Sequence, residues 1–171
     1  MRRSIRLLAL FALFCLLIPA NASAFSTSAA AAVLMDAERG EVLYAEHAAD
    51  RHLIASTTKI MTAAVALRHY APTEKVTVSE RAAATEGSSM YLKVGEIVTV
   101  EELLYGLILA SGNDAAAALA EHNAGSCGDF AALMNQKCGE LGLQHSHFMN
   151  PHGLDDPEHY SCARDLARIM A

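Results

Sequence analysis

The sequence predicts an α+β fold in which a strand hairpin precedes a mostly helical body. An apolar run, a Glu38-Arg39-Gly40 turn and an alternating run follow one another over residues 30–46, which is typical of a β-hairpin. Apolar residues recur at helical spacing over residues 57–70, with no interrupting glycine or proline. Alanine is abundant and tryptophan is absent, which favours close-packed helices over a β-sandwich.

After this first helix we expect a short strand and then a capped helix. Residues 76–78 alternate apolar and polar, as a strand with one buried face does. Thr99 followed by Glu102 is a capping box, in which each side chain satisfies a free backbone amide of the other residue. The apolar run behind it predicts a helix that ends near Ala110.

The tripeptide Ser111-Gly112-Asn113 predicts a tight break before the next helix. We expect Asn113 or Asp114 to cap a helix over residues 115–122, because both side chains accept hydrogen bonds from free helix amides. Gly142 predicts the end of a further helix. The last two helices are expected over residues 129–141 and 161–171.

The amino terminus has the pattern of a cleaved secretory signal peptide over residues 1–24. Three arginines precede an apolar run of 12 residues, Leu7 to Ile18, and Ala22-Ser23-Ala24 offers small residues at the cleavage position. The alternative is a membrane anchor, but a spanning helix needs roughly 20 apolar residues. We therefore expect export followed by cleavage.

The balance of charge is acidic. The chain carries 13 Lys and Arg against 19 Asp and Glu, a net charge of −6, and cleavage of the three amino-terminal arginines leaves −9. Such a surface argues against nucleic acid and against an anionic membrane face as partners, because both are negatively charged.

The predicted mature chain has three cysteines, Cys127, Cys138 and Cys162. An odd number leaves at least one thiol unpaired. A bridge between Cys127 and Cys138 is one interpretation, and buried thiols are the one that we favour.

Ser56 and Lys59 form a Ser-x-x-Lys motif at the predicted start of the first helix. A helix amino terminus presents free N–H groups and positive potential, which stabilise a developing oxyanion. One helical turn brings Lys59 onto the face of Ser56, where a lysine with a lowered pKa would serve as the base that a serine nucleophile needs. The simpler alternative is a serine cap followed by a solvated lysine.

Ser111 and Asn113 extend this motif, because a break between two helices can project both side chains into a cleft. A second hydroxyl at Ser111 would relay a proton to a leaving group. The Asn113 amide would bind a substrate carbonyl and fix Lys59. The alternative is a plain interhelix turn with Asn113 as a cap.

Ser-x-x-Lys followed by Ser-x-Asn is the signature of penicillin-binding proteins and serine β-lactamases. The chain resembles one family among them, the D-alanyl-D-alanine carboxypeptidases (low-molecular-mass penicillin-binding proteins), over residues 25–171. Gly112 is similar to that family, whereas many class A β-lactamases carry Asp there. The resemblance is carried by the segments LIASTTKIMTA, GSSMYLKVGE, LLYGLILASGNDAAAALAEH and HFMNPHGLDDPEHYSCARDLARI.

The resemblance implies a fold of the β-lactamase/transpeptidase type. An antiparallel sheet is flanked by helices, with a helical subdomain beside it. Ser56 is expected at the buried end of its helix, and Ser111 is expected to face it from the helical part. The expected location is the periplasm or the outer face of the cytoplasmic membrane.

The resemblance also implies a mechanism, with neither cofactor nor metal. Ser56 attacks the penultimate D-alanine of a peptidoglycan stem peptide that ends in D-Ala-D-Ala. Lys59 is the general base, Ser111 relays the proton to the leaving D-alanine, and Asn113 orients the substrate. Water then hydrolyses the acyl-enzyme. A β-lactam antibiotic acylates Ser56 in the same way.

The family's third motif, Lys-Thr-Gly or His-Thr-Gly on a strand that lines the cleft, does not occur in this chain. We therefore expect residues 25–171 to be an incomplete catalytic domain whose carboxy-terminal strands lie beyond them. Any membrane attachment is expected to depend on that further segment. The 171 residues alone are predicted neither to fold stably nor to turn over substrate.

Three alternative functions belong to other classes of protein. A zinc site would use the carboxy-terminal histidines and neighbouring carboxylates, although no helical His-x-x-x-His supports it. A penicillin-binding sensor or cell-wall binding module would keep acylation of Ser56 without efficient deacylation. A β-lactamase would need a carboxylate to activate water, and the spacing of Asp155 and Glu158 selects neither. The residues considered for zinc are His145, His147, His152, His159, Asp155 and Asp156.

Overall fold

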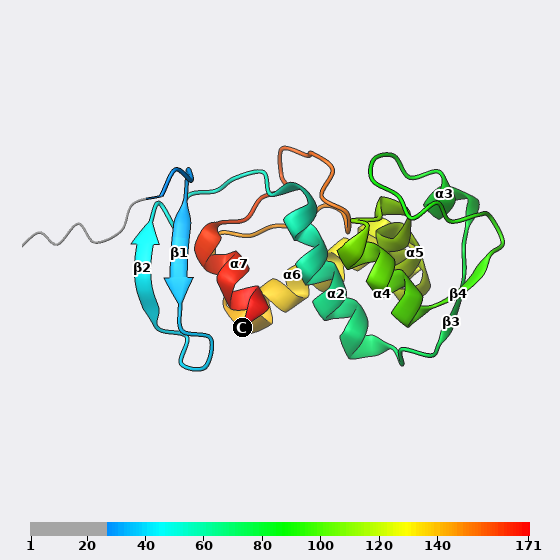
Figure 1. Ribbon diagram of the computed structural model, residues 1–171, viewed down its shortest axis with the longest axis horizontal. Helices are drawn as coiled ribbons and strands as arrows, with labels where there is room; N and C mark the ends of the chain where they lie inside the picture. The colour runs from blue at the N-terminus through cyan, green and yellow to red at the C-terminus, as the bar shows by residue number, and fades with distance from the viewer. Residues whose placement is uncertain (1–26) are drawn as a thin grey trace, which may run out of the picture.

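The computed structural model describes residues 27–171, and its first element is the expected hairpin. Strands β1 (Ala32–Met35) and β2 (Val42–Glu46) pair antiparallel at one end of the molecule (Figure 1). The turn is closed from both sides: Gly40 donates to the carbonyl of Asp36, and the Asp36 amide donates to the carbonyl of Glu41, both at 2.8 Å. The predicted signal peptide lies outside the described residues.

Helix α2 (Thr58–His69) runs through the middle of the molecule and begins behind a short 3-10 turn, η1 (Ala55–Thr57) (Figure 1). The sequence predicted one helix over residues 57–70, and the structure confirms it to within one residue at each end. The other predicted helices are also present. They are α4 (Val100–Leu109), α5 (Asn113–Ala124), α6 (Cys127–Leu141) and α7 (Ala163–Met170).

The end of the molecule opposite the hairpin holds a second small sheet, of which the sequence predicted one strand. Strand β3 (Lys75–Thr77) pairs antiparallel with β4 (Ile97–Thr99), so that Val76 lies opposite Val98. Between them lies the four-residue helix α3 (Glu80–Ala83), which is too short to show a hydrophobic period.

Side-chain caps decide where most helices begin. Thr99 and Glu102 form the predicted capping box of α4. The cap expected for α5 was wrong: Gly112 occupies the cap position and makes no side-chain bond there, while Asn113 and Asp114 lie in the first turn. Their side chains are committed to other partners, described below. Gly142 ends α6 with a φ of +65°, as expected.

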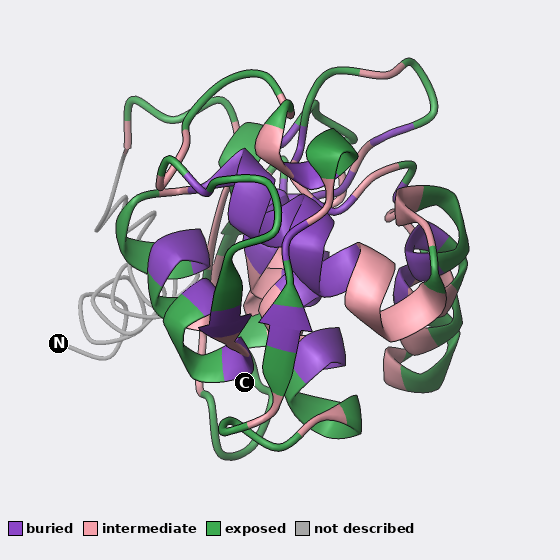
Figure 2. Cartoon of the chain, turned by 90° about the vertical axis from the view of Figure 1, so that its right-hand side faces the viewer, coloured by how far each residue is buried: buried purple, intermediate pink, exposed green. Residues whose placement is uncertain are grey.

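The core is built around α5, whose first eight residues, 113–120, are all buried. Alanines dominate this stretch, so neighbouring helices approach closely, and α5 contacts α2, α3, α4 and α6. A second cluster packs Phe130, Met134 and Phe148 against Met61 of α2. Figure 2 shows the buried residues gathered in the centre and exposed ones around them.

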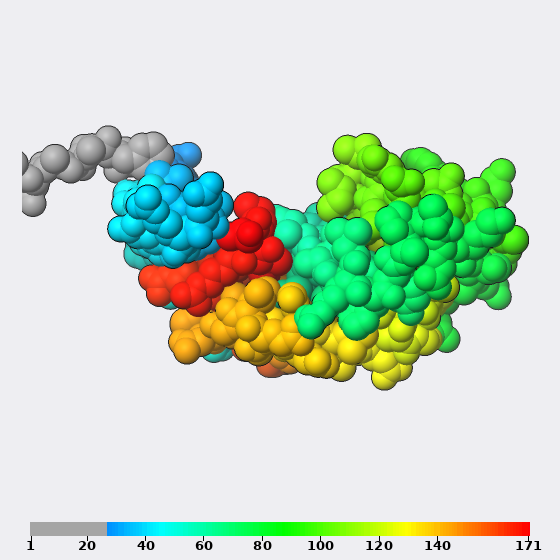
Figure 3. Space-filling model, turned by 90° about the horizontal axis from the view of Figure 1, so that it is seen from below, coloured from blue at the N-terminus to red at the C-terminus, as the bar shows by residue number. Residues whose placement is uncertain are grey.

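The hairpin is attached to this body through α7. Helix α7 contacts β1, and the view from below shows it lying between the hairpin and α6 (Figure 3). Among the described residues no helix has both the length and the apolar character required to cross a bilayer.

A disulfide between Cys127 and Cys138 is ruled out by α6. Both residues lie in this one helix, 11 residues apart, which separates their Cα atoms by about 16 Å at 1.5 Å per residue. A bridge needs Cα atoms within about 7 Å. Both thiols are free, and Cys138 is buried, as the favoured interpretation held.

Candidate active site

Ser56 lies in the 3-10 turn that leads into α2, and it is exposed. The end of α2 next to it is buried, as expected, since Thr58 and Lys59 are 0% and 2% exposed, while the turn leaves Ser56 itself at the surface. Ala55 holds a φ of +44° just before it, an uncommon backbone conformation for a residue with a Cβ. Thr57 stabilises the turn by donating from its hydroxyl to the Ile54 carbonyl at 2.5 Å.

Lys59 lies one turn further on and is only 2% exposed. Its ammonium nitrogen is the point at which the predicted site residues meet. Nζ lies 3.1 Å from Ser56 Oγ, 3.2 Å from Ser111 Oγ and 2.7 Å from Asn113 Oδ1. A fourth contact, at 3.0 Å, is to the backbone carbonyl of His152. The structure thus brings together all four predicted catalytic residues and adds the backbone of His152, which was considered from the sequence only for zinc.

These four contacts are of two chemical kinds. Asn113 Oδ1 and the His152 carbonyl can only accept hydrogen bonds, whereas the hydroxyls of Ser56 and Ser111 can also donate. A neutral lysine has two N–H bonds and one lone pair. When Lys59 gives its two N–H bonds to the two acceptors, the lone pair is left for a serine hydroxyl. The arrangement therefore suits a base that removes the proton of Ser56.

The charge state of Lys59 is set by its surroundings. Burial lowers the pKa of Lys59, and the negative charge of Asp114 opposes that shift. Among the described residues no carboxylate lies within ion-pair distance of Nζ. A buried amine without such a partner loses its proton more readily.

Ser111 and Asn113 reach Lys59 because the chain turns sharply between α4 and α5. Ser111 has a φ of +54°, and Gly112 donates to the Gly106 carbonyl at 3.0 Å. A Cβ on Gly112 would lie 2.8 Å from Asp114 Oδ1, so a larger residue here would require the Asp114 carboxylate to shift. The predicted tight break is confirmed, and it aims both side chains at α2.

Asn113 is held by the loop between α3 and β4. Its Nδ2 donates to the Glu86 carbonyl at 2.6 Å, and its backbone amide donates to the Ser88 carbonyl at 2.7 Å. A Cβ on Gly87 would lie 2.5 Å from Asn113 Nδ2. Because the amide nitrogen is fixed in this way, Oδ1 must face Lys59.

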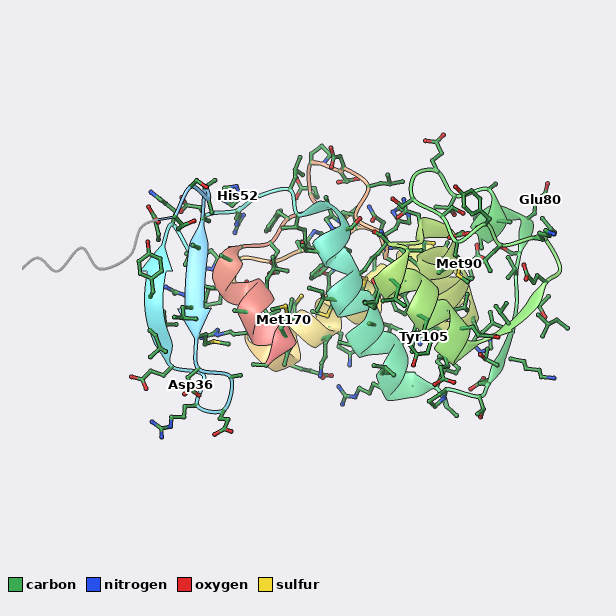
Figure 4. All side chains as sticks on the ribbon, viewed as in Figure 1. Asp36, His52, Glu80, Met90, Tyr105 and Met170 are labelled. Carbon is green, nitrogen blue, oxygen red and sulfur yellow. The ribbon has the colours of Figure 1, made fainter. Side chains whose placement is uncertain are left out.

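Asp114 holds the same loop from inside the core. Its carboxylate accepts from the Ser89 hydroxyl and from the amides of Met90 and Leu92, at 2.6 to 3.0 Å. Burial acts to raise the pKa of Asp114, but these hydrogen bonds outweigh it and leave the pKa below its ordinary value. Figure 4 shows Met90 beside α4. It packs on Gly106, where a Cβ would lie 2.1 Å from its sulfur.

The loop over residues 149–159 also borders the site, although its residues were considered from the sequence only as possible zinc ligands or as a water-activating carboxylate. It is fastened to α2 at several points. Thr62 donates to the Pro151 carbonyl at 2.6 Å, and Thr58 Oγ1 lies 2.7 Å from His159 Nε2. Thr58 and Thr62, which lie four residues apart on one face of α2, were the available signal, because a buried polar residue needs a partner.

The carboxy-terminal histidines do not form one cluster. His159 bonds to Thr58 of α2, whereas His152 Nδ1 accepts from the Leu154 amide at 3.3 Å. Burial, with the charge of Lys59, lowers the pKa of His152 to about 4. His147 is bonded through Nδ1 to the Glu158 carbonyl. Asp155 and Glu158 are exposed. The zinc set considered from the sequence is therefore dispersed over several environments.

A different set of possible metal ligands does lie close together. The ligand atoms of His145, Cys162 and Asp165 lie within 4.8 Å of one another. Hydrogen bonds account for two of the three. Cys162 caps α7 by accepting from the Asp165 amide, and Asp165 accepts from the His145 amide and the Ser146 hydroxyl. This network fastens the loop before residue 148 to α7.

The fold is that of the penicillin-binding proteins of low molecular mass. Penicillin binding protein 6B from Escherichia coli superposes with a TM-score of 0.83 at 38% identity, over 90% of this chain and 52% of that one. The carboxypeptidase DacD from Francisella tularensis gives 0.82 at 38% identity, over 85% of this chain and 37% of that one.

Sequence comparison identifies the family within this class of proteins. A family model described as D-alanyl-D-alanine carboxypeptidase matches residues 19–171. The carboxypeptidase DacF of Bacillus subtilis is 43% identical over 87% of this chain, and DacA of Haemophilus influenzae is 42% identical over 81%. The chain therefore belongs to the D-alanyl-D-alanine carboxypeptidase family, peptidase family S11. It spans 39% and 37% of the length of these two relatives.

Proposed function

We propose that the protein to which this chain belongs is a serine-type D-alanyl-D-alanine carboxypeptidase that trims the terminal D-alanine from peptidoglycan stem peptides. The observation that carries the proposal is the position of Lys59 Nζ, which lies between the hydroxyls of Ser56 and Ser111 and the acceptor Asn113 Oδ1. The family of the chain supports the substrate class.

The proposed reaction assigns one step to each residue. Ser56 Oγ forms a bond to the carbonyl carbon of the penultimate D-alanine while Lys59 takes its proton. The C–N bond then breaks, and the proton passes from Lys59 through Ser111 to the nitrogen of the leaving D-alanine. Asn113 keeps Lys59 oriented through Oδ1 and offers the second N–H of Nδ2, which is not used by the Glu86 carbonyl, to the substrate backbone. Water attacks the resulting ester and regenerates Ser56.

β-Lactams are proposed as a second class of ligand, because they present an amide carbonyl to the same nucleophile. One of the similar solved structures is a penicillin binding protein of Haemophilus influenzae. Ring opening would transfer the acyl group to Ser56. The amine released by ring opening corresponds to the leaving D-alanine of the peptide reaction, but it would stay covalently attached to the acyl group. The acyl-enzyme would then hydrolyse slowly, so the drug would act as an inhibitor.

Export is proposed as the route to this substrate. The pattern of residues 1–24 supports a cleaved signal peptide, and peptidoglycan lies outside the cytoplasmic membrane. Amino-terminal sequencing of the exported protein is expected to begin at Phe25. A protein that retains its first 24 residues and stays in the cytoplasm would contradict this part of the proposal.

The proposal is tested on the protein produced from its natural gene, with Ser56→Ala as the variant. Ser28→Ala is the matched control, because Ser28 is an exposed serine near the hairpin. We expect fluorescent penicillin to label the wild type and the control but not Ser56→Ala. A synthetic peptide that ends in D-Ala-D-Ala is expected to release D-alanine with the same dependence on Ser56.

Two results would overturn the proposal. A folded wild type that takes no label would remove the acyl-transfer mechanism. Label without release of D-alanine from any stem peptide would favour a penicillin-binding sensor instead.

A further inference from the structure

His159 is a buried histidine that the proposed reaction does not use. Its side chain is 1% exposed, and its ring packs edge-on against Phe148, with centroids 5.5 Å apart and planes at 89°. Both ring nitrogens have partners. Nε2 lies 2.7 Å from the hydroxyl of Thr58, and Nδ1 lies 3.1 Å from the backbone amide of Met149.

The partners fix the tautomer of the ring. A backbone amide can only donate, so Nδ1 of His159 must be unprotonated to accept from Met149. In a neutral imidazole the proton then sits on Nε2, which donates to Thr58 Oγ1. Burial lowers the pKa of His159, with Asp156 opposing, so the neutral form prevails at neutral pH.

The ring thereby joins the two ends of the loop over residues 149–159 to the start of α2. Thr58 is the first residue of α2 and lies two positions after Ser56. Between the loop ends, the His152 carbonyl accepts from Lys59 Nζ at 3.0 Å. A loop that shifted by a fraction of this distance would remove one of the two acceptors that leave the Lys59 lone pair free for Ser56.

We propose that His159 is a positioning residue for acyl transfer, which acts through Thr58 on the turn that carries Ser56 and through Met149 on the loop that carries the His152 carbonyl. This proposal rests on the proposed function of Ser56 and Lys59. His159 touches none of the reacting atoms. Its role is to hold the nucleophile and the second acceptor of the base in one fixed geometry.

The two hydrogen bonds can be separated by substitution. His159→Gln places an amide N–H where Nε2 lies and keeps the bond to Thr58. His159→Asn places an oxygen near Nδ1 and keeps the bond from Met149. His159→Ala removes both, and Thr58→Val removes the hydroxyl while keeping the shape of Thr58. His69→Asn is the matched control, because His69 is an exposed histidine at the opposite end of α2.

The measurement is the rate of fluorescent penicillin labelling of the natural full-length protein, per folded molecule and over a range of drug concentrations. We expect His159→Ala to slow the acylation step on the order of 100-fold, as a displacement of about 1 Å does, with little change in the half-saturating concentration. His159→Gln and His159→Asn should each recover part of this loss. The control should label like the wild type.

A double-mutant cycle tests whether His159 acts through Thr58. The Thr58→Val, His159→Ala double variant is expected to be no slower than the slower single variant, because the shared interaction is lost once. Unchanged acylation per folded molecule in His159→Ala, with only a lowered melting temperature, would overturn the proposal and leave a purely structural role. Absence of label on the wild type would instead contradict the proposed function itself.

Discussion

Gly153 lies against the backbone just before the nucleophile: a Cβ on Gly153 would be 1.9 Å from the carbonyl oxygen of Ala55. The φ of Gly153 is +88° and that of Ala55 is +44°. The loop and the turn of Ser56 therefore interlock through two uncommon backbone conformations, and the loop can approach so closely only because residue 153 has no side chain.

We predict that Gly153→Ala damages both stability and acylation. The Ala55 backbone must move away, which should cost about 1–3 kcal/mol of unfolding free energy and displace Ser56. Gly139→Ala is the control, because Gly139 lies in α6 with nothing within 4 Å of its would-be Cβ. That variant should gain about 0.5–1 kcal/mol. Denaturant unfolding and penicillin labelling check both; equal stability of the two variants would contradict the packing argument.

The pH dependence of acylation should report the protonation of Lys59. The base must be neutral, and burial lowers the pKa of Lys59 while Asp114 opposes, so the rate should rise with pH through a midpoint below 10.5. Stopped-flow labelling across pH measures this midpoint. A rate that is flat or falls over this range, in a protein that stays folded, would argue against Lys59 as the base.

Replacing Lys59 with arginine keeps the charge and removes the base, because arginine does not deprotonate in proteins. We expect acylation to fall on the order of 10²–10⁴-fold, the range of a lost general base. Lys75→Arg, on an exposed position of β3, should leave the labelling rate unchanged. Comparable rates for Lys59→Arg and Lys75→Arg would contradict the assignment.

Asp114→Asn should destabilise the protein in a pH-dependent way. The pKa of Asp114 lies below 3.8, because its hydrogen bonds outweigh the effect of burial. A carboxylate with a depressed pKa stabilises the fold above its ordinary pKa, and this stability is lost as pH falls through the depressed value. In Asp114→Asn an amide nitrogen would face the Leu92 amide, which should lower the unfolding free energy by about 1–3 kcal/mol at neutral pH.

Urea unfolding at neutral and acidic pH is the measurement. A loss of unfolding free energy in Asp114→Asn that is as large in acid as at neutral pH would contradict this explanation. Glu101→Gln, at an exposed position, is the control.

Cys127 and Cys138 should both behave as free thiols. In denaturant without reductant both should be alkylated, since α6 holds them too far apart to bridge. In the native protein at neutral pH, Cys138 should resist alkylation, because burial raises the pKa of its thiol to about 12. Peptide mass spectrometry distinguishes these states. A disulfide-linked peptide that contains both residues would show that α6 is not continuous.

The elements that the sequence predicted well are those with local signals. The capping box at Thr99 and the terminating Gly142 mark helix ends through contacts within a few residues. Ser56 and Lys59 are likewise neighbours on one helical turn, so their contact follows from spacing alone. Ser111 and Asn113 were named from the break between two helices and from the resemblance, since their contacts with Lys59 span 52 and 54 residues.

The remaining parts of the site depend on contacts between distant segments. The His152 carbonyl lies 93 residues from Lys59 in sequence, and a backbone oxygen carries no signal in the residue type. The same holds for the bond between Thr58 and His159, which are 101 residues apart. The cap of α5 was mispredicted because Gly112 holds the cap position, Asn113 bonds the preceding loop, and Asp114 divides its hydrogen bonds between that loop and the Ala115 amide.

These sequence separations have a kinetic meaning. Lys59 acquires its four neighbours from segments one turn, 52, 54 and 93 residues away, whereas the hydrogen bonds of each helix close within four. Because distant contacts carry a larger loop-closure cost, helices should form early in refolding and the surroundings of Lys59 late. Regain of covalent labelling should therefore lag behind regain of helical circular dichroism, which makes the candidate nucleophile a reporter of the last stage of folding.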